Sequence, residues 1–122
     1  MLGQKAAINL IQKYLERLPI EVDEAILFGS TAKDTRLAES DVDLIVISEG
    51  FKEMALPQRF LILQKNWVSA TDLEAFGFTR QEFDSLKDKS IVVQEAVEYG
   101  IKLKTKRSKT KPKLALTNSP SL

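Results

Sequence analysis

One segment constrains the fold more than any other: the run Asp-Val-Asp-Leu-Ile-Val-Ile-Ser at residues 41–48. Its centre is rich in β-branched residues, which are enriched in strands, and polar residues bound it on both sides. The segment therefore predicts a strand, and a strand of this kind needs neighbouring strands and helices to bury it.

The sequence before this strand predicts one helix and one further strand. Apolar residues recur at three- and four-residue spacing from Ile8 to Leu18, which predicts an amphipathic helix that ends at Pro19. Residues 25–28 form a short apolar run that ends at Gly29, and this run is typical of a buried strand.

The sequence after it continues the alternation of helix and strand patterns. Residues 56–67 show helical spacing again, and residues 71–76 alternate with period two. Thr79 and Glu82 fit a capping box at the start of another helix. Residues 90–103 predict a last helix followed by a short edge strand. This order predicts an α/β (α+β) fold in which helices cover a small mixed sheet.

The length and composition exclude several classes of protein. A chain of 122 residues fits one domain. It has no Cys and no His, so thiol chemistry, zinc ligation and histidine acid–base catalysis are not expected from this chain alone. No apolar stretch approaches the ~18 residues of a membrane span, and no signal-peptide core is visible at the N-terminus. We therefore expect a soluble, cytoplasmic protein with no membrane partner.

The charges are distributed unevenly along the chain. Residues 104–122 carry six basic side chains and no acidic one, while acidic residues outnumber basic ones in the rest of the chain. We expect one domain over residues 1–104 and a basic tail without fixed structure over residues 105–122. The tail either keeps the protein soluble or contacts nucleic acid or an acidic partner. Nucleic acid is the less expected partner, because no aromatic residues for base stacking are interleaved with the charges.

Gly29 and Ser30 are candidates for phosphate binding. They stand where a predicted strand turns into a short predicted helix, and successive backbone N–H groups at a helix N-terminus suit an anionic phosphate. Gly29 leaves room for close approach, and the Ser30 hydroxyl can cap the helix or donate to a phosphate oxygen. By itself a Gly-Ser pair at such a junction is usually only a turn.

Asp41 and Asp43 are candidates for metal binding. Side chains two residues apart on a strand point to the same face, so these carboxylates project together from the start of the apolar strand. Like charges on one face repel each other, and a cation relieves that repulsion. Mg²⁺ prefers hard oxygen ligands and is held by one or two carboxylates together with substrate phosphates.

Together these residues carry a resemblance to a known family. The segment FGSTAKDTRLAESDVDLIVIS at residues 28–48 resembles the signature of the DNA polymerase β-like nucleotidyltransferase superfamily. More closely, it resembles the minimal nucleotidyltransferases of prokaryotes, whose pattern is a strand, Gly-Ser, a short helix, and Asp-x-Asp opening the next strand. The resemblance covers about residues 5–103, and it implies the nucleotidyltransferase fold.

The resemblance implies a role for each candidate residue. Asp41 and Asp43 would ligate the metal, and Glu74 would complete the site as the third carboxylate. Gly29 and Ser30 would hold the triphosphate, and Lys33 is a weaker candidate for that task. The family often has Arg and Gly where this chain has Lys33 and Asp34.

The choice of the third carboxylate stays open between two acids. Asp72 and Glu74 share one face of the predicted strand at residues 71–76. The distance to the start of the Thr79 helix favours Glu74, because the family's third acid lies at a similar distance from the equivalent Thr. The family more commonly uses Asp at this point, which favours Asp72.

The resemblance also implies an activity. Such a protein would be an enzyme that transfers a nucleoside monophosphate, AMP from ATP, to a hydroxyl of an acceptor, with two Mg²⁺ ions as cofactor. Some minimal nucleotidyltransferases are antitoxins that modify a tyrosine of a HEPN-type toxin, so a helical partner of this type is expected here. The alternative is a non-catalytic module of the same fold that neutralises a partner by binding. The oligomeric state is left open, a homo-oligomer included.

Overall fold

The computed structural model describes residues 4–29, 42–69 and 71–103. The described helices and strands follow one another in the order that the sequence predicts, and the short helix predicted after Gly29 lies outside the described residues. In chain order they are α1 (Gln4–Arg17), β1 (Glu24–Phe28), β2 (Val42–Ile47), the 3₁₀ turn η1 (Glu49–Phe51), α3 (Leu56–Lys65), β3 (Leu73–Phe78), α4 (Arg80–Leu86), α5 (Ile91–Tyr99) and β4 (Ile101–Leu103).

The strands form one mixed sheet in the order β3-β2-β1-β4. β1 runs antiparallel to both β2 and β4, whereas β3 runs parallel to β2. A parallel neighbour needs a crossover, and α3 lies on that connection. The sheet therefore has two edges, β3 and β4, and the expected mixed α+β architecture is confirmed.

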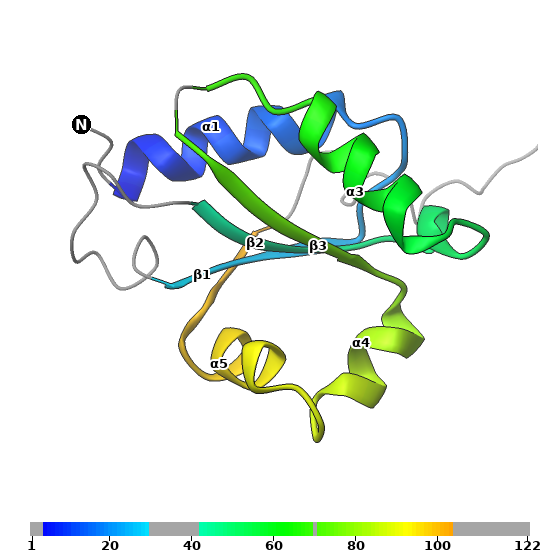
Figure 1. Cartoon of the computed structure of the whole chain (residues 1–122). Coiled ribbons are helices and arrows are strands. Elements are labelled where there is room, and N and C mark those ends of the chain that lie inside the picture. The colour runs from blue at the N-terminus through cyan, green and yellow to red at the C-terminus, as the bar shows by residue number, and fades with distance from the viewer. Residues whose placement is uncertain (1–3, 30–41, 70, 104–122) are drawn as a thin grey trace, which may run out of the picture.

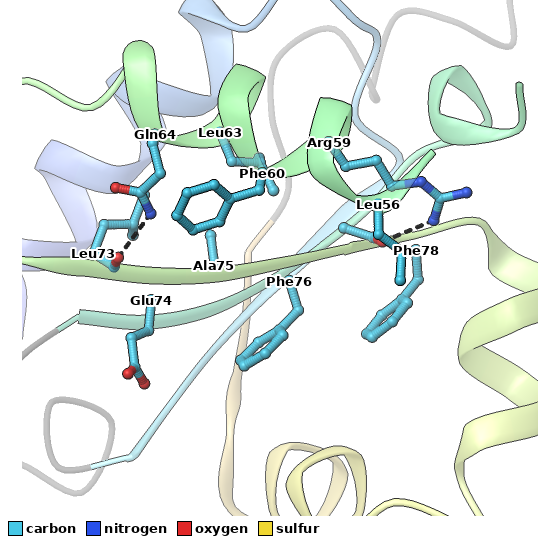
Figure 2. A pocket seen from close by; sticks show the side chains of 11 residues that line it. Leu56, Arg59, Phe60, Leu63, Gln64, Leu73, Glu74, Ala75, Phe76 and Phe78 are labelled. Carbon is cyan, nitrogen blue, oxygen red and sulfur yellow. Dashed lines mark hydrogen bonds between the residues drawn. The ribbon is translucent and has the colours of Figure 1, made fainter. Parts of the chain in front are cut away.

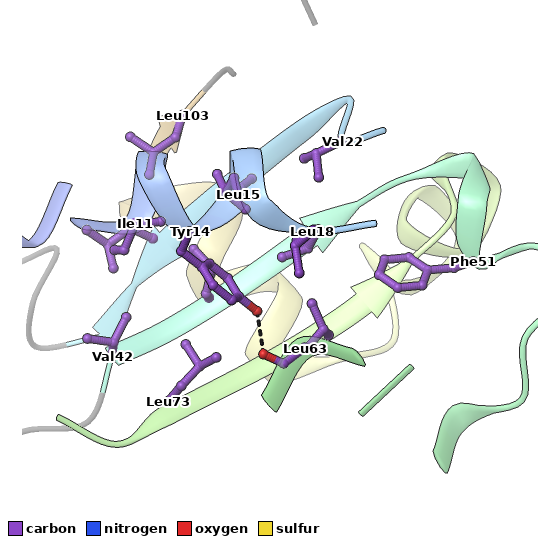
Figure 3. Close-up of a cluster of buried hydrophobic side chains, with 14 residues drawn as sticks. Ile11, Tyr14, Leu15, Leu18, Val22, Val42, Phe51, Leu63, Leu73 and Leu103 are labelled. Atoms are coloured by element: carbon purple, nitrogen blue, oxygen red, sulfur yellow. Dashed lines mark hydrogen bonds between the residues drawn. The ribbon is translucent and has the colours of Figure 1, made fainter. Parts of the chain in front are cut away.

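Helices cover both faces of this sheet (Figure 1). α1 and α3 lie over one face, where a large apolar cluster includes Ile11, Leu15, Leu44 and Leu63 (Figure 3). α4 and α5 lie over the other face, where a smaller cluster contains Phe83 from α4 and the buried residues of α5. Side chains alternate between the two faces along each strand, so both clusters draw on the same strands.

A polar contact joins α1 to α3 inside the larger cluster. The Tyr14 hydroxyl donates a hydrogen bond of 2.7 Å to the Leu63 carbonyl, and burial raises the pKa of Tyr14. The Tyr14 ring also meets Trp67 edge to face at 5.1 Å between ring centroids. The Trp67 indole N–H in turn donates to the Thr71 carbonyl, which fixes the segment that enters β3.

Two predicted elements differ from the observed ones at their ends. The strand predicted at residues 71–76 runs from Leu73 to Phe78, because its bounds are set by parallel pairing with the whole of β2. Gly77 is part of this strand, and a Cβ there would collide with the Phe51 ring. The helix predicted at residues 56–67 ends at Lys65, so Trp67 packs from the loop beyond it.

The predicted helix signals near the C-terminus are confirmed. Thr79 and Glu82 form the reciprocal capping box of α4, and the Ser90 side chain caps α5 by accepting a hydrogen bond from Val93 N–H. Gly100 ends α5, and the short edge strand β4 follows it. Residues 104–122, which include the predicted basic tail, lie outside the described residues.

Among the residues that the structure describes, no helix is both long and apolar enough to span a membrane.

Candidate functional site

Asp43 and Glu74 lie side by side on neighbouring strands. Each is the second residue of its strand, and the parallel register of β2 and β3 makes the two residues direct partners. Side chains of partnered residues lie on the same face of a sheet. Both carboxylates therefore point to the face that α4 and α5 cover, near the N-terminal ends of β2 and β3 (Figure 1). Asp43 is half-buried and Glu74 is exposed.

Gly29 approaches Asp43 from the other side. The antiparallel register pairs Phe28 with Asp43, so the chain leaves β1 next to the carboxylate. Gly29 has a φ of 77°, a backbone conformation that favours glycine. A Cβ at this position would collide with Asp43 Oδ2. The sequence needs Gly29 here for both its backbone conformation and the space that it leaves.

This arrangement suits a divalent cation. Two adjacent carboxylates repel each other, and a hard cation such as Mg²⁺ takes oxygen ligands of this kind. Within the described part of the chain, no three acidic side chains come together as a set of metal ligands. Asp41, Ser30 and Lys33 lie outside the described residues. The predicted site residues that the structure brings together are therefore Gly29, Asp43 and Glu74.

Asp72, the alternative third carboxylate, lies outside β3. It is exposed and precedes the first residue of the strand, and its backbone carbonyl accepts a hydrogen bond of 2.8 Å from Val42 N–H. The register leaves Glu74, not Asp72, directly beside Asp43.

An apolar groove of about 560 Å³ adjoins Glu74 at the outer edge of β3 (Figure 2). Its lining comes from α3 and β3 and includes Leu56, Phe60, Leu63, Glu74, Ala75 and Phe76. Phe60 is 57% exposed and Phe76 is 39% exposed. The sequence analysis did not predict this groove, because helical spacing alone does not tell which apolar residues of a helix are left uncovered.

Arg59 supports the opposite end of the β2–β3 pair. Its buried guanidinium donates to the carbonyls of Met54 and Gly77 and to both carboxylate oxygens of Glu82. The hydrogen bonds that Glu82 accepts, chiefly those from Arg59 and also one from the Thr79 backbone, hold the pKa of Glu82 below its usual value. The Arg59 guanidinium is thus engaged within the fold, and the sequence pattern gave no sign that this arginine would be buried.

Several solved structures have a fold similar to that of this chain. A protein from Sulfolobus solfataricus, assigned provisionally to the nucleotidyltransferases, is 25% identical with a TM-score of 0.55, over 70% of this chain and 78% of that chain. A mutant MntA–HpeT toxin–antitoxin is 21% identical with a TM-score of 0.56, over 85% of this chain and 77% of that chain. A toxin–antitoxin crystallised with AMP-PNP is 23% identical with a TM-score of 0.58, over the same shares.

Comparison with curated proteins gives no significant match. A sequence model of the nucleotidyltransferase domain, in contrast, matches residues 8–112, which include every predicted site residue. By this match and by its fold, the chain belongs to the nucleotidyltransferase domain family.

Proposed function

We propose that this protein is a Mg²⁺-dependent enzyme that transfers AMP from ATP to a hydroxyl of a HEPN-type toxin partner, and so acts as an antitoxin. The observation that carries the proposal is the pairing of Asp43 with Glu74 beside Gly29. Family membership supports nucleotidyl transfer. The likeness to toxin–antitoxin structures, one of them with AMP-PNP, supports the nucleotide and the kind of partner.

The residues have distinct roles in this proposal. Asp43 and Glu74, with Asp41, hold Mg²⁺, which when bound neutralises charge on the phosphates and aligns them. Gly29 and Ser30 hold the triphosphate, with Lys33 as a further contact. The acceptor oxygen forms a bond to the α-phosphorus, the bond from that phosphorus to the bridging oxygen breaks, and pyrophosphate leaves. The proton of the acceptor hydroxyl passes to Glu74.

Thermal unfolding with and without Mg-ATP tests the binding half of the proposal. Ligand that binds only the folded state stabilises it by about 2.7 kcal/mol at 100 times Kd. We expect Asp43→Asn to abolish this stabilisation while the variant still folds, because Asn keeps the size and polarity of the side chain and removes only its charge. Asp72→Asn is the matched control and should retain the stabilisation. An unchanged Mg-ATP effect in Asp43→Asn would remove the proposed site.

Label transfer tests the catalytic half. The protein is incubated with Mg²⁺, ATP labelled at the α-phosphate, and candidate HEPN-type partner proteins. We expect label on that partner, loss of transfer in Glu74→Gln, and a milder effect in Asp72→Asn. An inactive Asp72→Asn beside a fully active Glu74→Gln would exchange their roles. Tight association without any transfer would favour the alternative, a non-catalytic module that neutralises its partner by binding.

A further inference from the structure

The strand order places the apolar groove on one definite side of the candidate site. Gly29 follows β1, Asp43 lies on β2 and Glu74 lies on β3, so the three follow one another across the sheet. The groove lies beyond Glu74, at the outer edge of β3. The proposed function places the triphosphate at Gly29, so the acceptor would approach Glu74 from the side of β3.

The backbone of β3 offers free hydrogen-bonding groups along this edge. Val42 N–H donates to the Asp72 carbonyl, and Ser48 N–H donates to the Phe78 carbonyl. Backbone groups alternate in direction along a strand, so the even-numbered residues of β3 bond to β2 and the odd-numbered ones face outward. Ala75 therefore directs both its N–H and its C=O into the groove.

The side chains of α3 leave only the middle of this edge open. Gln64 Nε2 donates to the Leu73 carbonyl at 2.9 Å, and Arg59 donates to the Gly77 carbonyl at 3.0 Å. Between them, the N–H and C=O of Ala75 have no hydrogen-bond partner among residues 4–29, 42–69 and 71–103. Unpaired groups of this kind are a template for an added strand.

The walls and charges of the groove indicate what kind of chain fits there. Phe60 lies on the α3 side of Ala75, and Phe76 lies on the other side together with Glu74 (Figure 2). The one cation among the lining residues, Arg59, is occupied by Glu82 and by backbone carbonyls. Apolar walls, an exposed carboxylate and no available cation disfavour a phosphate-rich partner and favour a polypeptide with apolar side chains.

We propose that an extended segment of the acceptor protein adds to the edge of β3 at Ala75 and so brings its hydroxyl to Glu74. This inference rests on the proposed function and specifies the acceptor. A residue of the segment lies opposite Ala75 and directs its side chain toward Phe60. Its two neighbours point to the other face, one beside Glu74 and one beside Phe76. The segment thus carries three consecutive residues: a hydroxyl residue, an apolar residue and a second apolar residue, in either chain direction.

An array of capped heptapeptides tests this proposal without nucleotide. Position four is either apolar or polar. One of positions three and five is Tyr, Ser or Thr, and the other is either apolar or polar. We expect binding only where position four and the flanking position without the hydroxyl residue are both apolar. The donor to the Ala75 carbonyl is the N–H of position four in a peptide antiparallel to β3 and the N–H of position five in a parallel one. We expect N-methylation of that donor to weaken binding about tenfold, or about 1.4 kcal/mol. Amide exchange of Ala75 should slow when an unmethylated peptide binds.

Two variants on α3 give a matched pair. Phe60→Ser changes a groove residue, whereas Leu61→Ser changes a neighbour that is 63% exposed and does not line the groove. We expect Phe60→Ser to weaken peptide binding about tenfold and Leu61→Ser to change it less than twofold. Both variants should keep the Mg-ATP stabilisation of the unchanged protein, since neither residue belongs to the carboxylate site.

Several results would overturn the inference. They are an array with no binding peptide, a preference for polar residues at position four, binding that tolerates N-methylation, or equal binding by the two variants. A dimer that dissociates in Phe60→Ser would assign the groove to a second copy of this chain. Each of these outcomes leaves the Mg-ATP measurement intact, so failure here is distinguishable from failure of the proposed function.

Discussion

At one end of the β2–β3 pair, polar groups bond to one another, and at the other end two carboxylates stand together. Ser48 follows β2, donates to the Glu21 carbonyl at 2.6 Å and accepts from Gly50 N–H. Arg59 donates to the Gly77 carbonyl near the C-terminal end of β3 and to Glu82. At the other end, the partnered residues are Asp43 and Glu74. We call the first the closed end and the second the carboxylate end, and we expect the closed end to contribute more to the stability of the sheet.

Breaking the closed end should have the largest effect on stability. Arg59→Met keeps an apolar side chain of similar length but removes four hydrogen bonds from the buried guanidinium. We expect a loss of about 2–3 kcal/mol in the free energy of unfolding, measured by urea denaturation, because buried carbonyls lose their donor. The added stabilisation by Mg-ATP should survive in the folded variant.

Arg80→Met is the control for this variant. Arg80 also forms an ion pair, at 2.7 Å to Glu24, but its side chain is 42% exposed. A surface pair of this kind contributes at most about 1 kcal/mol. Equal losses in the two variants would show that burial at the closed end has no special weight.

A methyl group added at Gly29, at the carboxylate end, should weaken the binding of Mg-ATP more than it lowers the stability of the fold. Gly29→Ala must adopt a left-handed conformation and displace the Asp43 carboxylate. We expect a loss of about 1–2 kcal/mol in stability, from the backbone conformation, and loss of the Mg-ATP stabilisation.

A double-mutant cycle separates these two causes. In an Asp43→Ala background the collision is absent, so Gly29→Ala should lower the free energy of unfolding only through the strained backbone conformation. The difference between the losses in the two backgrounds measures the coupling between Gly29 and Asp43. Strictly additive stabilities would mean that Gly29 and Asp43 do not meet.

The charge of Glu82 should contribute a smaller, pH-dependent effect. Glu82→Gln keeps a residue suited to the capping box but removes the charge that faces Arg59. Because the folded state lowers the pKa of Glu82, its stabilisation is present above the usual value of 4.5 and is lost as the pH falls through the lowered pKa. The side chain is 43% exposed, so we expect less than about 1 kcal/mol at pH 7.

Urea denaturation of both proteins from pH 7 down to pH 3 measures this effect. The two free energies should converge at the acid end. If the difference between the two free energies of unfolding grew as the pH falls, the charge of Glu82 would not stabilise the folded state as we expect.

Removal of residues 105–122 should have the smallest effect. We propose that the folded domain ends at residue 104, because the sequence of residues 105–122 shows no apolar periodicity that would tie it to the core. The urea midpoint and the slope of the transition should therefore stay unchanged. A clear loss of stability would place part of residues 105–122 in the domain, as would fit a family match that extends to residue 112.

Much of the fold was predictable because its signals are local. The capping box at Thr79, the cap at Ser90 and the apolar run of β2 depend only on nearby residues, and each is found where the sequence predicts it. The bounds of β3 were not predictable, because they follow from pairing with a strand that lies far away in the sequence. The 3₁₀ turn after β2 was also missed, since it depends on how Ser48 caps it.

The candidate site divides in the same way. Gly29 and Asp43 were candidates from residue type and spacing. Glu74 came from the family resemblance, with Asp72 as the alternative, and its placement beside Asp43 depends on strand register. The groove depends on which side of α3 is covered. Arg59 and Leu63 are buried, whereas Leu56 and Phe60 are exposed, and a helical period fits both sets of residues.

The parallel register also bears on when the protein can begin to work as it is synthesised. A chain leaves the ribosome from its N-terminus, so β1, Gly29 and Asp43 emerge before the crossover helix and before Glu74. The two carboxylates become neighbours only after β3 has emerged and paired with β2. A nascent chain therefore has no complete pair of carboxylates, so under the proposed function we expect it not to bind Mg-ATP until β3 has been made.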